Sequence, residues 1–378
     1  MILRLWAIGL AMLLTGVAHA ADYPRTVVDL AGRGVRIAAA PQRILLQDSN
    51  DLLALALLER DDPLRRVIAW NNNLRSSDPS LWKLLVQRWP QAEQVKNLTF
   101  SNGGEVDIEG ILRARPDLIV ARLESRAAVD NSVLGALLER LGIPLIYVDS
   151  ESDPLHHVPR SIALLGQTLG REAQADAYLQ AYRGRLQGLL ARTVGLPARR
   201  VFVEARAGQA GGGACCHTQA DSGWGLMVQA LGGINLGSRL LVSESGDVAL
   251  ETLVRSKPDL YLMTGTQRVR NGVATIPFGY GVSDQAIQAE LARLMARPGF
   301  ANVAQTPQSC VQGLYHQFYN SVFNIVGLEY LAQMLWPERF ADLDPAADYR
   351  RLVADFTQLP DAPFAFQAQR CFAEDSPP

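Results

Sequence analysis

Long hydrophobic runs are almost absent from this chain of 378 residues. The run near its start, Leu5 to Val17, is shorter than the roughly 18 apolar residues that a membrane-spanning helix needs. An excess of charge of one sign is also lacking, since 36 Lys and Arg stand against 38 Asp and Glu, a formal net charge of −2. This near balance argues against nucleic acid or an acidic membrane surface as a partner.

The short apolar run has the features of a secretory signal peptide, which we assign to residues 1–20. Arg4 precedes the run, and Ala18-His19-Ala20 follows it as an A-x-A cleavage site. The residue after this site is Ala21, whereas lipoprotein processing would need a cysteine there. We therefore predict a protein that is released into the periplasm.

The motifs of common enzyme classes are missing too. The glycines at 211–213 lack the Lys-Ser/Thr pair of a phosphate-binding loop, and no Gly-x-Ser-x-Gly occurs. A cysteine hydrolase built from Cys216 and His316 is one alternative, but adjacent cysteines in an oxidising compartment are poor nucleophiles. We predict a binding protein rather than an enzyme, with no cofactor of its own.

Cysteine and histidine are scarce, with four and five residues, and no His-x-His or Cys-x-x-Cys spacing occurs. Cys310 and Cys371 are candidates for a disulfide. The adjacent Cys215 and Cys216 leave three alternatives open: a bond to each other, separate bonds to the other two cysteines, or thiols near a metal. A zinc or nickel site made from His217, His316 and a thiolate is the corresponding metal-binding hypothesis.

The chain does contain a repeat. Residues 108–120, IEGILRARPDLIV, are matched by residues 250–262, LETLVRSKPDLYL, at a spacing of 142 residues (251 − 109). Each copy reads as a short helix, a Pro-Asp break and a buried parallel strand. The repeat predicts an α/β protein with two Rossmann-like lobes, each with a parallel sheet, and a ligand in the cleft between them.

The pattern between the two copies sets the domain boundaries. Alternating strands and helices predict an N-terminal lobe over residues 21–153. Apolar residues at helical spacing predict one long, continuous linker helix over residues 154–195. A C-terminal lobe then follows over residues 196–378, and its last fifteen or so residues look irregular.

Loops that follow the carboxyl ends of the strands should face the cleft. The ligand-binding candidates in these loops are polar, aromatic or sulfur-containing: Trp70, Asn72, Arg126, Arg206, Cys215, Cys216, His217, Tyr280, Tyr315, His316 and Tyr319. Arginine and aromatic side chains suit a bulky, anionic chelate. The alternatives are aromatic core packing for the 315–319 segment and a structural disulfide loop for 215–217.

Taken together, the hairpin VVDLAGRGVRIAAAPQRIL, the paired repeat, the long helix and LGGINLG at 231–237 resemble the periplasmic binding proteins that deliver ferric siderophores, haem and cobalamin to ATP-driven importers. The resemblance implies a monomer that carries a ferric siderophore, with iron present only inside the chelate. Haem, cobalamin, or a nickel or other metal chelate is the alternative cargo. It also implies that Glu109 and Glu251 dock onto the two subunits of an ABC permease dimer. The alternative role for these two glutamates is interaction with the helix dipole.

Overall fold

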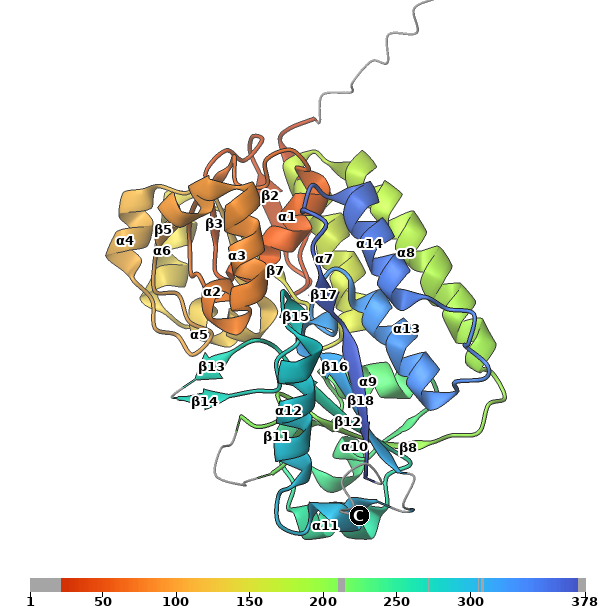
Figure 1. Cartoon of the computed structure of the whole chain (residues 1–378). Coiled ribbons are helices and arrows are strands. Elements are labelled where there is room, and N and C mark those ends of the chain that lie inside the picture. Colours follow the sequence, from red (N-terminus) through yellow and green to blue (C-terminus); the bar gives the residue numbers. More distant parts are fainter. Residues whose placement is uncertain (1–21, 210–214, 271, 305, 307–308, 373–378) are drawn as a thin grey trace, which may run out of the picture.

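The computed structural model describes residues 22–209, 215–270, 272–304, 306 and 309–372. The predicted signal peptide, residues 1–20, lies outside the described residues, as does most of the glycine-rich stretch at 208–213. The described chain forms two lobes, with the N-terminal lobe in the upper part of Figure 1 and the C-terminal lobe below it. No described helix is long and apolar enough to cross a membrane.

The N-terminal lobe is built on a parallel sheet of five strands in the order β5-β4-β3-β6-β7. Its central strands are fully buried, which explains their continuous apolar sequences. The strands are β3 (Ile44–Leu46), β4 (Val67–Trp70), β5 (Lys96–Asn97), β6 (Leu118–Arg122) and β7 (Leu145–Val148), and a hairpin of β1 (Arg25–Val28) and β2 (Gly34–Ile37) precedes them. The helices are α1 (Leu52–Leu58), α2 (Leu74–Ser77), α3 (Pro79–Arg88), α4 (Ile108–Ala114), α5 (Arg126–Asp130) and α6 (Val133–Leu141).

The C-terminal lobe has a sheet of five strands in the order β10-β8-β12-β16-β18, and only β18 runs antiparallel to its neighbour. These strands are β8 (Arg200–Glu204), β10 (Ile234–Asn235), β12 (Leu260–Gly265), β16 (Cys310–Tyr315) and β18 (Gln367–Cys371). Three short pairs accompany the sheet: β9 (His217–Gln219) with β11 (Ser245–Asp247), β13 (Val269–Arg270) with β14 (Val273–Ala274), and β15 (Gly279–Tyr280) with β17 (Phe364–Ala365). The helices are α9 (Gly223–Ala230), α10 (Gly237–Leu240), α11 (Leu250–Ser256), α12 (Asp284–Met295), α13 (Asn324–Leu335) and α14 (Pro345–Phe356).

The predicted repeat is confirmed down to single hydrogen bonds. Helices α4 and α11 both end on a residue with left-handed backbone geometry, Arg115 at φ 49° and Lys257 at φ 47°. The Asp of each Pro-Asp break then accepts a backbone N–H at the start of a neighbouring strand: Asp117 from Arg43 at 2.8 Å, and Asp259 from Arg200 at 2.7 Å. The Pro-Asp break therefore ends the helix and fixes the register of the strand that follows.

The predicted continuous linker helix is wrong. The segment forms two helices, α7 (Pro154–Leu169) and α8 (Glu172–Thr193), which pack against each other. Gly170 ends α7 with φ 65°, and the N–H of Arg171 bonds to Gly166 O at 2.7 Å. A glycine in this conformation is a common helix terminator, because it lacks the Cβ that makes left-handed geometry costly.

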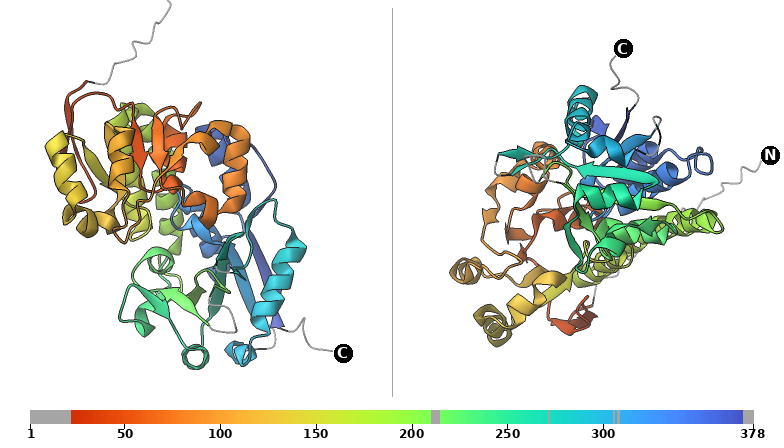
Figure 2. Two further views of the ribbon diagram at one scale, coloured as in Figure 1. Left: turned by 90° about the vertical axis from the view of Figure 1, so that its left-hand side faces the viewer. Right: turned by 90° about the horizontal axis from the view of Figure 1, so that it is seen from below.

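The C-terminal segment is more ordered than the sequence suggested, and it returns to the N-terminal lobe. Strands β17 and β18 occupy the part of the predicted irregular tail that lies within the described residues, up to 372, and Cys310 is bonded to Cys371 where β16 and β18 pair. Helix α14 lies beside the N-terminal lobe in the views of Figures 1 and 2, and Arg60 donates to Ala354 O at 2.6 Å. One apolar core also continues from α1 and α3 through α7 and α8 into the C-terminal lobe. These connections restrict how far the lobes can separate.

Candidate functional site

The N-terminal wall of the site is organised around a buried arginine at the carboxyl end of β6. Arg122 has a side chain only 2% exposed, and its guanidinium lies 3.3 Å from Asp51, 3.6 Å from Glu151 and 3.9 Å from Asp149. Its backbone N–H donates to Gln47 Oε1 at 2.7 Å, and Ser125 Oγ donates to the same oxygen at 2.8 Å. These bonds fix the strand end that carries the charge.

Carboxylates outnumber cations on this wall. The pKa of Asp51 is raised to about 7, chiefly by burial; Arg122 opposes the shift and the nearby Asp48 charge adds to it. The pKa of Glu124 is also raised, first by desolvation and then by Glu151. Ionised carboxylates are therefore crowded here, and a positive charge would stabilise them.

The C-terminal wall is aromatic and basic. His316 directly follows β16, is 1% exposed, and has Nδ1 2.8 Å from Thr264 Oγ1. Desolvation lowers its pKa well below the usual value, and the charges of Arg206, Arg268 and His217 lower it further, so the imidazole is neutral. The His316 ring lies 5.1 Å from that of Tyr319, which packs 6.0 Å from Trp224.

The two walls influence each other and are bonded directly. Burial raises the pKa of Tyr319, with a further contribution from Glu151 of the other lobe. Asn320 Nδ2 donates to Glu151 Oε1 at 3.1 Å. Three more bonds join the lobes: Tyr315 to Asp78, Tyr280 N to Ser80 Oγ at 3.2 Å, and Thr266 Oγ1 to Ser77 O at 3.0 Å.

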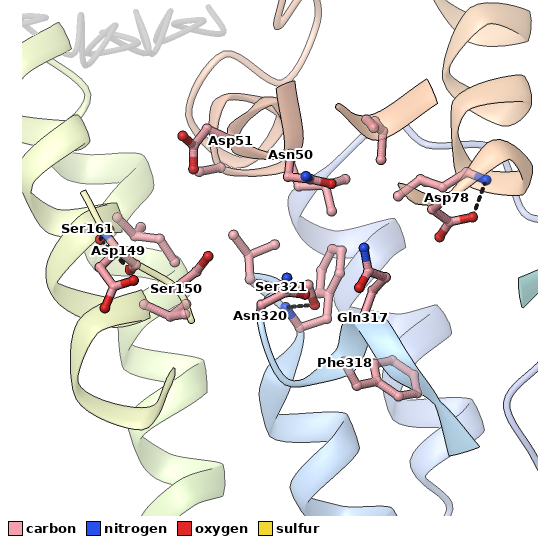
Figure 3. A pocket seen from close by; sticks show the side chains of 18 of the residues that line it. Asn50, Asp51, Asp78, Asp149, Ser150, Ser161, Gln317, Phe318, Asn320 and Ser321 are labelled. Atoms are coloured by element: carbon pink, nitrogen blue, oxygen red, sulfur yellow. Dashed lines mark hydrogen bonds between the residues drawn. The ribbon is translucent and has the colours of Figure 1, made fainter. Parts of the chain in front are cut away.

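A cavity lies within this interface, between η1 (Ser49–Asp51), α7 and the segment that follows β16 (Figure 3). Its cavity volume is about 40 Å³, measured as the space open to the centre of a water molecule. Its polar lining is Asn50, Asp51, Asp78, Asp149, Ser150, Ser161, Gln317, Asn320 and Ser321. We refer to it as the interlobe chamber.

This architecture matches known proteins. The family model for periplasmic binding proteins matches residues 55–305. The chain belongs to this family. Its members are solute-binding proteins of ABC importers, and they act outside the cytoplasm.

Several solved structures share the fold of this binding protein. The TroA-like periplasmic binding protein FepB from Veillonella parvula is 20% identical with a TM-score of 0.81, covering 91% of this chain and 99% of its own. Molybdate-bound MolA from Haemophilus influenzae is 17% identical with a TM-score of 0.60, covering 88% and 97%. Helicobacter pylori CeuE with bound Ni(II) is 15% identical with a TM-score of 0.61, covering 89% and 97%. No curated protein sequence matches the chain.

Several predicted ligand contacts are buried in the binding protein. Trp70 is fully buried and packs edge-on against Trp82 at 5.9 Å, so its assignment to the cleft is corrected to the core. Tyr280 and Tyr315 are also buried, the first bonded to Tyr349 OH at 2.8 Å and the second to Asp78. The aromatic-core alternative for the 315–319 segment therefore holds for Tyr315. Tyr280 is a core residue too, which corrects its assignment to the cleft, and both tyrosines join the lobes to each other.

Two further polar candidates have structural partners of their own. Arg126 is exposed, pairs with Asp130 at 3.1 Å and donates to Ala31 O, so its predicted role opposite the C-terminal wall is corrected. Asn72 accepts from Ser49 Oγ at 3.2 Å and from Arg75 N, which places it in the turn after β4.

The cysteine and histidine candidates separate into two groups. Cys215 and Cys216 are bonded to each other, and His217 Nδ1 lies 2.9 Å from Asp247 Oδ1. Among the described residues, the one group of His, Cys, Asp and Glu side chains close enough to share a metal is Glu204, Cys215 and Cys216. The predicted metal set of His217, His316 and a thiolate is therefore corrected. Glu204 is itself paired with Arg297 at 2.7 Å.

Arg206 remains as a predicted residue near the facing walls. His316 and Tyr319 lie beside it but are each only 1% exposed, so the aromatic-core alternative applies to them as well as to Tyr315. Sequence reasoning missed Arg122, Asp51, Glu151 and Gln317. The signal for Arg122 was present, because a charged residue that ends an otherwise apolar parallel strand lies at the ligand edge of the sheet.

Proposed function

We propose that this protein captures a metal chelate, foremost a ferric siderophore, between its lobes and delivers it to an ABC importer. Haem, cobalamin, or another chelate or free metal such as nickel is the alternative cargo. The observation that carries the proposal is the pair of facing walls. Arg122 and its carboxylates lie on the N-terminal lobe, and Arg206, His316 and Tyr319 lie on the C-terminal lobe.

The size of the interlobe chamber limits where such a ligand sits. Ligand pockets for organic molecules span roughly 300–1,000 Å³, far more than the water-admitting space of about 40 Å³ found there. A chelate must therefore bind at the outer carboxyl edges of the sheets, or the lobes must part to admit it. The shared apolar core favours a small hinge motion.

For delivery, we propose that Glu109 and Glu251 contact the two permease subunits. Both lie in the first turns of the repeated helices α4 and α11, and both are exposed, Glu109 with 90% of its side chain. Two carboxylates in equivalent positions suit a partner that presents the same basic surface twice.

Tryptophan fluorescence tests the cargo directly. Trp224 packs on Tyr319, so a ferric or haem ligand at the C-terminal wall should quench its emission. We would titrate the purified protein with ferric siderophores, haem and cobalamin, and measure by native mass spectrometry what it carries from iron-starved cells. Absence of any bound chelate, together with unquenched emission for all three classes, would contradict the proposal.

A further inference from the structure

The two disulfides of this chain differ in what they hold together. Cys310 and Cys371 are 61 residues apart and join β16 to β18, so their bond closes a large loop of the unfolded chain. Cys215 and Cys216 are adjacent, and a bond between neighbours closes no such loop. Loop closure is the main way in which a disulfide stabilises a fold, and the fold strengthens in return the bond that stabilises it. Stability of the fold therefore neither explains nor protects the Cys215–Cys216 bond.

The Cys215–Cys216 bond lies beside a small pocket at the carboxyl end of β8. The pocket has a volume of about 140 Å³, on the same measure as the interlobe chamber. Cys215 lines the pocket and is half-buried, whereas Cys216 is 1% exposed. Access helps to decide which sulfur of a disulfide is attacked by a thiol. A thiol that enters this pocket meets Cys215.

The charges that line the pocket favour an anionic attacking group. Glu204 accepts from Arg297 through both carboxylate oxygens, at 2.7 and 2.8 Å, and His217 is paired with Asp247 at 2.9 Å. The Arg206 guanidinium has no hydrogen bond or ion pair with any described residue. Arg206 also has φ 53°, a left-handed conformation that is costly for a residue with a Cβ and is typical of binding sites. Its unpaired charge attracts a thiolate, which is the reactive form of a thiol.

The buried sulfur has a hydrogen-bond donor beside it. The Tyr261 hydroxyl lies 3.3 Å from Cys216 Sγ, and burial and then Glu204 raise its pKa well above the usual value, so the phenol keeps its proton. The same hydroxyl lies 2.7 Å from Glu204 Oε2, but Arg297 already donates to that carboxylate, so the proton is available to the sulfur. A hydrogen bond to a thiolate stabilises it, which makes Cys216 the better leaving group.

We propose that the Cys215–Cys216 bond is a thiol–disulfide exchange site for small anionic thiols, with Cys215 as the attacked sulfur and Cys216 as the leaving sulfur. A thiolate attacks Cys215 Sγ, the S–S bond breaks, and its electron pair leaves on Cys216. A second thiolate then attacks the external sulfur of the mixed disulfide, which releases an external disulfide and a thiolate at Cys215. Two external thiols thus supply the two electrons, and their protons pass through solvent to the two cysteines. The inference does not depend on the cargo.

The first test is reduction of the folded protein by reduced glutathione over a range of concentrations. Free thiols are blocked with N-ethylmaleimide and assigned to single residues by peptide mass spectrometry. We expect Cys215 and Cys216 to be blocked at a glutathione concentration roughly tenfold lower than Cys310 and Cys371, which are the internal control. Reduction of both pairs at the same concentration would overturn the proposal.

Single serine variants distinguish the two sulfurs. Cys216→Ser leaves Cys215 as a free thiol at the pocket, and Cys215→Ser leaves Cys216 as a buried one. We expect oxidised glutathione to modify Cys215 in the first variant roughly ten times faster than Cys216 in the second. Equal rates, or faster modification of Cys216, would contradict the assignment of attacked and leaving sulfur.

The charge of the external thiol tests Arg206. At equal thiolate concentration, we expect 3-mercaptopropionate to reduce the bond about ten times faster than the cationic thiol cysteamine, with 2-mercaptoethanol between them. Arg206→Gln should remove this preference. Arg255→Gln, the same change at an exposed position on α11, is the control and should retain it. Faster reduction by cysteamine, or an unchanged preference in Arg206→Gln, would overturn the proposal.

Discussion

The two lobes share a scaffold but differ in the side chains at the ends of their strands. Units α4–β6 and α11–β12 end their helices on the same backbone geometry and anchor their strands through equivalent aspartates. The lobes differ at the strand ends that face each other, because β6 ends on a buried arginine among carboxylates, whereas β16, the neighbour of the repeated strand β12, leads into a neutral histidine near arginines. The repeat thus specifies the helix-strand scaffold of both lobes. The residues at the strand ends make the N-terminal wall acidic and the C-terminal wall basic.

The lobes also protect their sheet edges differently. In the N-terminal lobe the hairpin covers β7, with Leu30 N bonded to Tyr147 O at 3.0 Å and Arg33 donating to Leu145 O at 2.9 Å. In the C-terminal lobe an antiparallel strand, β18, and the Cys310–Cys371 bond protect the equivalent region. One sheet edge is thus protected by hydrogen bonds alone, whereas the equivalent edge of the other sheet is also held by a disulfide.

Replacing Arg122 should have the largest effect and would test the asymmetry of the walls. Arg122→Ala leaves buried carboxylates without their partner, which typically costs about 3–5 kcal/mol. Arg126→Ala is the matched control, since this exposed pair contributes at most about 1 kcal/mol. Urea unfolding of the ligand-free variants measures both, and equal losses would contradict the assignment of Arg122 as the organising charge.

Removing the covalent cover should have the next largest effect. A disulfide that closes a loop of this length, with its cysteines 61 residues apart, stabilises by about 2–4 kcal/mol. We expect Cys371→Ser to lower the free energy of unfolding by that amount and to expose β18 to hydrogen exchange before β7. If β18 and β7 instead exchanged their amide hydrogens at the same rate, the two ways of protecting the sheet edges would be equivalent.

The pH dependence of the free energy of unfolding should be a smaller effect, and it depends on Asp51 of the N-terminal wall. Because the folded pKa of Asp51 is raised to about 7, its contribution to stability is complete below its unfolded value near 3.8 and is lost as pH rises through 7. We expect the free energy of unfolding, taken relative to that of Asp51→Asn, to fall by roughly 1–3 kcal/mol between about pH 4 and pH 7. Glu329, also raised to about 7, and His316, whose lowered pKa acts in the opposite direction, titrate in both proteins and cancel in this difference. An unchanged slope in this variant would rule out Asp51 as the titrating group.

Charge reversal at the repeated helices should have the smallest effect on the isolated protein. Glu109→Lys with Glu251→Lys should change stability by less than about 1 kcal/mol and leave chelate affinity unchanged, yet abolish uptake in cells. Arg140→Glu, a reversal of an exposed charge in the last turn of α6, is the control and should permit uptake. Loss of chelate affinity in the double variant would assign the glutamates to the ligand site instead.

The order of helices and strands was predictable from the sequence because the residue patterns that specify it are local. The Pro-Asp repeat and the apolar strands followed from local pattern. The oxidising compartment made Cys310 and Cys371 candidates for a disulfide but left their pairing open. The helix break was readable at Gly170 but was overridden by the apolar periodicity on both sides of it. The site was less predictable, because burial depends on distant packing: nothing local distinguishes Trp70, enclosed by Trp82, from an exposed tryptophan. Likewise, Arg122 and Arg126 are only four residues apart, yet the path of the backbone between them buries the first side chain and exposes the second.

The return of the chain to the first lobe has a consequence for the order of assembly. Helix α14 docks beside Arg60 and Arg88, and β18 is the outermost strand of the second sheet. Both elements follow residue 344, so neither lobe is complete until the segment 345–371 has been made. A chain truncated at residue 343 should therefore be cut by protease in both halves, whereas the chain that includes this segment resists. Synthesis of residues 345–371 thus completes both lobes at the same time.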